Sequence, residues 1–160
     1  MTAPELFARC RSIKDASHLR RVIDACTSAG INDLIVISGD TQHPAGPYTS
    51  AFTLMREIAE MTSGTMSLAI AGYPEPHPHT SAAQHLATLL EKQALASSLV
   101  TQMCFSSQSI LKYVSRIRHE GIHLPVIAGI PGHIETTRLL SLAAKIGVGP
   151  SLRFISRKGP

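Results

Sequence analysis

Short apolar runs alternate with longer amphipathic segments along this chain, and this alternation restricts the possible folds more than any single motif does. Each run has the length of a buried strand, and polar or turn-forming residues follow it directly. The motifs after four of these runs are Ser38-Gly39-Asp40, Gly72-Tyr73-Pro74-Glu75-Pro76-His77-Pro78, Thr101-Gln102 and Gly129-Ile130-Pro131-Gly132. Since the carboxyl ends of parallel strands gather on one face, we expect the four motifs to form one site.

The alternation continues along most of the sequence. Strands are predicted at residues 6–11, 34–37, 67–71, 98–102 and 124–130. Helices are predicted at residues 17–30, 50–61, 82–94, 108–120 and 135–146. Strands and helices in this order are typical of a parallel sheet with right-handed crossover connections. Because no linker or low-complexity segment interrupts the pattern, residues 1–160 are expected to form a single domain.

Residue spacing also predicts where helices begin and which faces are buried. Ser17 is expected to cap the first helix, and Gly30 is expected to end it. Apolar residues at helical spacing mark the inward faces of three helices. They are Leu19, Val22, Ile23 and Cys26, then Leu86, Leu89 and Leu90, then Ile110, Leu111, Val114 and Ile117.

The composition excludes several classes of protein. With 44% hydrophobic and 16% charged residues in 160, the chain can bury one core. No apolar stretch approaches the ~20 residues of a membrane helix, and no secretory signal is visible, so a cytoplasmic location is expected. The net charge is +4, but the basic residues are scattered apart from those at 153–158, and aromatic residues make up only 4%. Neither a nucleic-acid nor a membrane partner is therefore expected.

The three cysteines and the histidines do not form a metal-binding or disulfide pattern. Cys10, Cys26 and Cys104 lie far apart without a CxxC pair, which favours buried thiols in a reducing compartment. His77 and His79 alternate with prolines, but no carboxylate or cysteine stands at a suitable offset, so no metal site is expected.

The number of βα units leaves two architectures open. A complete (β/α)8 barrel needs eight strands and typically ~250 residues. About five units are present here, so the chain is either an open doubly wound sheet or a TIM-barrel type of fold with about five of its eight βα units.

The motifs themselves resemble the central part of the methylenetetrahydrofolate reductase family. The most specific element is the run Ala71-Gly72-Tyr73-Pro74-Glu75 with His77-Pro78. Gly39-Asp40, Thr101-Gln102 with Phe105, and Gly129-Ile130 occur in the family's order and close to its spacing. The resemblance covers residues from about 16 to 146 and favours the incomplete barrel. The alternative is an unrelated open-sheet protein that converged on the same loops.

The resemblance implies an enzyme that holds FAD. In that family NAD(P)H reduces the flavin, which passes hydride to 5,10-methylenetetrahydrofolate and gives 5-methyltetrahydrofolate for one-carbon metabolism and methionine biosynthesis. Asp40 matches a catalytic aspartate that acts electrostatically on flavin and folate, and Gln102 matches a glutamine that binds the folate substrate. The positions that match cofactor-binding residues are Ser38, Gly39, Tyr73, His77 and Lys92.

The chain also departs from the family pattern. Ser38 stands where the family usually has arginine, His85 replaces an aspartate, and His79 replaces a glutamate. The family's catalytic glutamate lies on the first strand of the barrel, whereas this chain is expected to begin near the third strand and to stop before the eighth. An alternative function is therefore a non-catalytic fragment or a folate- or flavin-binding module. Exposed sheet edges would favour a homo-oligomer or a partner that completes the barrel.

Each candidate residue also has a structural interpretation. Asp40 can cap a turn or the next helix, and Gln102 can be a satisfied polar group at the rim of a barrel. Cys104 has no histidine base paired with it by motif, so structural burial is predicted for its thiol.

Overall fold

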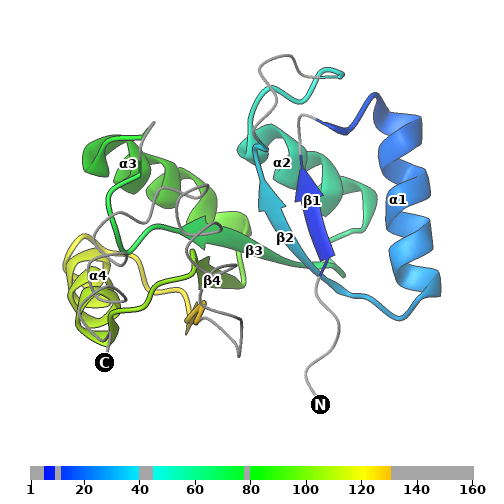
Figure 1. Cartoon of the computed structure of the whole chain (residues 1–160). Helices are drawn as coiled ribbons and strands as arrows, with labels where there is room; N and C mark the ends of the chain where they lie inside the picture. Colours follow the sequence, from blue (N-terminus) through cyan, green and yellow to red (C-terminus); the bar gives the residue numbers. More distant parts are fainter. Residues whose placement is uncertain (1–5, 10–11, 40–44, 78–79, 131–160) are drawn as a thin grey trace, which may run out of the picture. The chain divides into compact units, whose positions relative to one another are not determined.

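The computed structural model describes residues 6–9, 12–39, 45–77 and 80–130 (Figure 1). Parallel strands and helices alternate along these residues, which confirms the predicted α/β class. The strands are β1 (Leu6–Arg9), β2 (Asp33–Ile37), β3 (Ser67–Gly72), β4 (Ser98–Thr101) and β5 (Val126–Ile127). The helices are α1 (Ala16–Ser28), α2 (Ala51–Met61), α3 (Ala82–Lys92) with a 3-10 turn η2 (Gln93–Leu95), and α4 (Ser107–His119). Among the described residues, no helix is long and apolar enough to cross a membrane.

The strands form one sheet in the order β1-β2-β3-β4-β5. β1 and β2 are parallel with Leu6 opposite Leu34, and β2 and β3 are parallel with Leu34 opposite Leu68. The next strand continues this direction, because Ser97 N–H donates to the Leu68 carbonyl at 2.8 Å and Gln102 N–H donates to the Gly72 carbonyl at 2.7 Å. Strands that follow the chain order, joined by helices, are the repeats of the predicted TIM-barrel type.

The chain divides into two compact units. The first unit comprises Met1–Ala71 and Glu91–Leu99, and the second comprises Gly72–Leu90 and Val100–Pro160. The first unit thus holds β1, β2, α1 and α2, and the second holds the exit of β3, most of α3, and α4 with β5. A single domain over residues 1–160 stays a prediction.

The core of the first unit lies between its sheet and its helices. Leu34, Ile35 and Val36 are consecutive residues of β2, and all three are at most 3% exposed. Burial of successive residues means that both faces of β2 are covered, as expected for a strand in a parallel sheet. In α2 the side chains of Leu54 and Ile58 are 0% exposed, so one face of this helix is fully buried.

Helix α1 begins two residues earlier than its sequence suggests. Asp15, not Ser17, is the N-cap: its Oδ1 accepts the His18 N–H at 2.7 Å. The prediction of Ser17 as the cap is wrong because both residue types favour this position and the aspartate comes first in the chain. Gly30 adopts φ 72° just after the helix, which confirms the predicted end.

Two predicted core leucines are exposed. Leu90 is 43% exposed and Leu111 is 69% exposed, whereas Leu89 and Ile117 are each 1% exposed. The prediction that these two leucines point inward is therefore wrong. In α3 and α4 the buried face of the helix is narrower than the set of apolar residues at helical spacing. The helix predicted at residues 135–146 lies outside the described residues.

Candidate functional site

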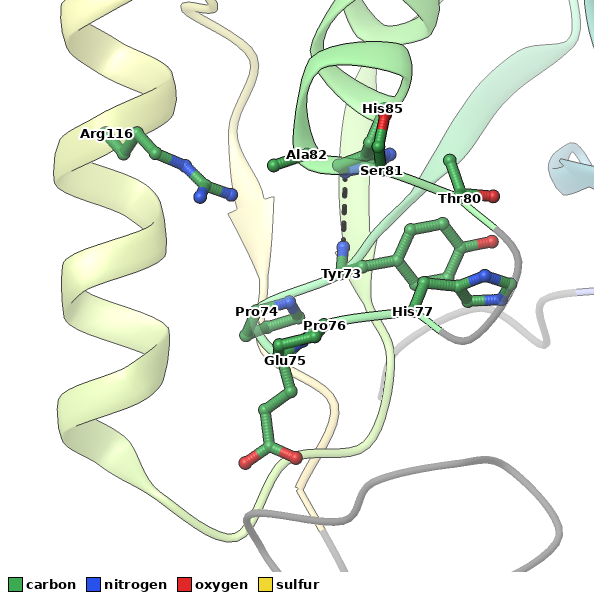
Figure 2. A pocket seen from close by; sticks show the side chains of 10 residues that line it. All are labelled: Tyr73, Pro74, Glu75, Pro76, His77, Thr80, Ser81, Ala82, His85 and Arg116. Atoms are coloured by element: carbon green, nitrogen blue, oxygen red, sulfur yellow. Dashed lines mark hydrogen bonds between the residues drawn. The ribbon is translucent and has the colours of Figure 1, made fainter.

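The segment that leaves β3 and the start of α3 surround a cavity of about 260 Å³ in the second unit (Figure 2). Residues 73–77 and 80–82 form most of its lining, and His85 and Arg116 complete it. Figure 2 shows Arg116 extending from α4 toward the other lining residues. The lining therefore combines aromatic rings, hydroxyl groups, a carboxylate and a guanidinium, which is the mixture typical of a polar ligand site.

Aromatic rings from the β3 exit contact one another beside the cavity. The rings of Tyr73 and His77 have centroids 4.5 Å apart at an interplanar angle of 43°. The rings of Tyr73 and His85 have centroids 4.7 Å apart at 54°. These separations lie at the short end of the range in which tilted aromatic pairs attract one another. Tyr73 thus occupies the middle of a three-ring cluster.

His85 joins this cluster to helix α4 through hydrogen bonds. The Tyr73 backbone N–H donates to His85 Nε2 at 3.3 Å, drawn as the dashed line in Figure 2. The Tyr113 hydroxyl lies 2.9 Å from the same nitrogen. His85 is 6% exposed and Tyr113 is 2% exposed, so both groups are buried where an unmade hydrogen bond is costly.

The phenol of Tyr113 stays protonated throughout the neutral range. Burial raises the pKa of Tyr113 to about 12, although the Tyr73 backbone N–H and the Arg116 guanidinium oppose this effect. The Arg116 Cζ lies 5.7 Å from the centroid of the Tyr113 ring, within the range of a cation–π contact.

The start of α3 is fixed by a reciprocal pair of hydrogen bonds. Ser81 N–H donates to Gln84 Oε1 at 2.9 Å, and Gln84 N–H donates to Ser81 Oγ at 3.2 Å. This is a capping box, which holds the first turn of a helix. An antiparallel bridge between His77 and Thr80 connects the β3 exit to this turn. The bridge and the capping box therefore hold the two segments that line the cavity.

Glu75 lies between two prolines and is buried. Its side chain is 8% exposed, and its Oε1 accepts a weak hydrogen bond from the Cys104 thiol at 3.7 Å. Cys104 is 2% exposed, which confirms that this thiol is buried. Cys104 and Cys26 are the free cysteines of the described part of the chain, and burial raises the pKa of the Cys26 thiol.

The backbone around Gln102 is held on two sides. Its N–H donates to the Gly72 carbonyl of β3 at 2.7 Å. On the other side, Gly129 N–H donates to Thr101 Oγ1 at 2.8 Å, and Cys104 N–H donates to the Gly129 carbonyl at 3.0 Å. The Gln102 side chain is partly buried. The end of β4 is thereby positioned by β3 on one side and by the segment that follows β5 on the other.

The structure brings two of the predicted cofactor residues, Tyr73 and His77, into direct contact. Lys92 is the last residue of α3 and is partly buried, in the first unit. Ser38 is exposed and Gly39 has φ 83°, directly after β2 in the same unit. Asp40 lies outside the described residues. The ring cluster is thus the part of the predicted site that the structure assembles.

Sequence reasoning did not place two side chains that shape this cluster. Tyr113 and Arg116 lie on α4, far along the chain from the β3 exit, and no motif connects them to it. The sequence identifies His85 only as a departure from the family pattern. Its 12-residue separation from Tyr73 gives no local signal, because the contact depends on how α3 returns to the end of β3.

Comparison with known proteins assigns the chain to a family. The family model described as methylenetetrahydrofolate reductase matches residues 9–147. Methylenetetrahydrofolate reductase (NADH) 1 of Arabidopsis thaliana is 29% identical over 126 residues, covering 68% of this chain and 21% of the relative. The 5,10-methylenetetrahydrofolate reductase of Escherichia coli is 31% identical over 118 residues, covering 70% of this chain and 38% of the relative.

A third relative shows the same partial coverage. The 5,10-methylenetetrahydrofolate reductase of Pectobacterium carotovorum is 31% identical over 121 residues, which cover 72% of this chain and 40% of the relative. The chain therefore spans between about a fifth and two fifths of the length of these curated relatives. The match includes the β3 exit and the whole ring cluster, and it removes the alternative of an unrelated open-sheet protein. The chain belongs to the methylenetetrahydrofolate reductase family.

Proposed function

We propose that this chain carries part of the flavin and folate site of a methylenetetrahydrofolate reductase. The observation that supports the proposal most strongly is the Tyr73–His77 ring pair, which lines the cavity at the end of β3. This pair lies within residues 9–147, the part that matches the family model. The relatives from Arabidopsis thaliana and Escherichia coli are named as reductases of methylenetetrahydrofolate.

The residues around the cavity fit part of FAD. The rings of Tyr73 and His77 offer surfaces for a planar ring system, and the hydroxyls of Thr80 and Ser81 can bind the polar groups of a dinucleotide. Arg116 adds a positive charge to the lining, which suits a diphosphate. When bound, FAD supplies hydride transfer from NAD(P)H to 5,10-methylenetetrahydrofolate, which becomes 5-methyltetrahydrofolate.

The remaining predicted residues take roles that their chemistry allows. Gln102 binds the folate, because an amide can donate to and accept from the edge of a pterin. Asp40 favours positive charge on the folate and disfavours excess negative charge on the flavin. Lys92, Ser38 and Gly39 contribute further to cofactor binding.

The wider setting of the chain follows from the same proposal. The product would supply methyl groups for one-carbon metabolism and methionine biosynthesis in the cytoplasm. β1 and β5 are the outer strands of the described sheet, and each pairs on one side. A second copy or another polypeptide that covers these edges would complete the barrel.

A flavin titration tests the proposal. We expect FAD added to the purified chain to give the visible absorbance band of bound flavin, and NADH to bleach it. Lys92→Ala is expected to weaken flavin binding, whereas Lys112→Ala, a change of an exposed lysine on α4, should leave it unchanged. Both variants remove one positive charge. A larger loss of flavin affinity in Lys92→Ala than in Lys112→Ala would therefore indicate that Lys92 contacts the flavin directly.

Two results separate this function from its alternatives. Flavin uptake without bleaching by NADH would favour a flavin- or folate-binding module over a reductase. A folded chain that takes up no flavin would contradict the proposed site.

A further inference from the structure

His85 links the ring cluster to helix α4 by hydrogen bonds. It lies on α3, accepts a hydrogen bond from the backbone of Tyr73, and lies 2.9 Å from the Tyr113 hydroxyl. Its ring also packs against Tyr73 at 4.7 Å and against Tyr113 at 6.0 Å between centroids. One side chain therefore connects three elements: the β3 exit, α3 and α4.

The donor on Tyr73 fixes the protonation of His85. A backbone N–H can only donate, so Nε2 must carry a lone pair and no proton. The proton of the neutral ring then resides on Nδ1, and the Tyr113 hydroxyl, 2.9 Å from Nε2, shares the single lone pair of this nitrogen with the Tyr73 N–H.

We propose that His85, as the neutral Nδ1-protonated tautomer, is a positioning residue that holds Tyr73 against His77 and so shapes the cavity for the cofactor. The inference rests on the proposed function only for the identity of the molecule that binds in the cavity, FAD. Tyr73 and His85 both line the cavity, and His85 also holds the backbone and the ring of Tyr73 in place. Tyr113 contacts the same ring nitrogen from α4.

The tautomer is tested without any cofactor. In nitrogen-15 NMR of histidine-labelled protein, we expect the two ring nitrogens of His85 to report a protonated Nδ1 and an unprotonated Nε2 at neutral pH. This is the opposite of the tautomer that predominates in free histidine. A protonated Nε2 would overturn the proposal whether or not the chain binds flavin.

Two amide substitutions test the position of the acceptor. The carboxamide of His85→Gln reaches the place of Nε2, whereas that of His85→Asn reaches the place of Nδ1. We expect His85→Gln to keep FAD affinity within about threefold of the original chain, and His85→Asn to lose about tenfold, since only the first retains an acceptor for Tyr73. Equal losses for the two variants would overturn the positioning role.

A tyrosine pair provides a milder test in case the histidine variants fold poorly. Tyr113→Phe removes one donor to His85, and Tyr48→Phe is the control, a tyrosine of the first unit that is also buried at 6% exposure. We expect Tyr113→Phe to speed hydrogen exchange at the Tyr73 amide about fivefold and to weaken FAD binding by a similar factor. Tyr48→Phe should change neither. If Tyr113→Phe behaves like Tyr48→Phe in the exchange measurement, the coupling through His85 is refuted independently of flavin binding.

Discussion

Gly129 has no room for a side chain, and this makes a single methyl group a strong perturbation. A Cβ built on Gly129 would overlap the Thr101 carbonyl oxygen and lie 3.3 Å from both the Gln102 carbonyl carbon and the Met103 nitrogen. All three contacts are backbone atoms. The strain in Gly129→Ala therefore cannot be relieved by rotating a side chain, and the end of β4 has to move.

The expected loss of stability can be built up from these contacts. Overpacking at a tight site costs ~1–3 kcal/mol. Movement of the strand end also weakens two hydrogen bonds, from Gly129 N–H to Thr101 Oγ1 at 2.8 Å and from Cys104 N–H to the Gly129 carbonyl at 3.0 Å. At ~0.5–1.5 kcal/mol for each bond, the free energy of unfolding of Gly129→Ala should fall by about 2–6 kcal/mol.

Urea unfolding followed by circular dichroism measures this loss. With a slope of ~2 kcal/mol/M, the midpoint of Gly129→Ala should lie about 1–3 M below that of the original chain. Gly64→Ala is the control, because Gly64 has φ 72° and no atom within 4 Å of an added Cβ. Its loss should be limited to the ~1–2 kcal/mol cost of a left-handed residue. A smaller loss for Gly129→Ala than for Gly64→Ala would refute the steric argument.

Two further predictions concern burial and pH. Leu54→Ala should lower the free energy of unfolding by ~2–5 kcal/mol because Leu54 is 0% exposed, whereas Leu111→Ala, at 69% exposure, should change it by less than ~0.5 kcal/mol; similar midpoints in urea would contradict this. Since burial raises the pKa of Tyr113 from 10.0 to about 12, the unfolded chain releases this proton first as the pH rises. Stability should therefore fall between pH 10 and 12, and less steeply in Tyr113→Phe, which thermal melts over this pH range would measure; equal slopes would exclude Tyr113 as the cause.

The periodic features of the sequence predict the elements well but their limits less well. Continuous apolar runs predict strands such as β2 and β3, because both faces of a central parallel strand are covered. The sequence does not determine the start of α1, because Asp15 and Ser17 are both good caps and only the backbone geometry selects Asp15. Leu111 is exposed although its position fits the helical spacing, because an apolar residue at that spacing can still lie outside the buried face of the helix.

The candidate site was predictable where it is local and unpredictable where it is not. Tyr73 and His77 lie four positions apart in one motif, and the structure puts their rings in contact. The hydrogen bond between His85 and Tyr113 joins residues 28 positions apart on different helices, and no spacing rule encodes it. Such contacts depend on the angle at which each helix returns to the sheet.

The order of strands in the sheet also has a consequence for how the chain folds. Leu6 pairs with Leu34 and Leu34 pairs with Leu68, so the partner of each residue lies only 28 or 34 positions further along. A ribosome adds ~5–20 residues per second, and each of these strands therefore waits about 1–7 s for its neighbour to be synthesised. No strand of these pairs needs a partner from a distant part of the chain. The sheet can grow one repeat at a time, in the direction of translation.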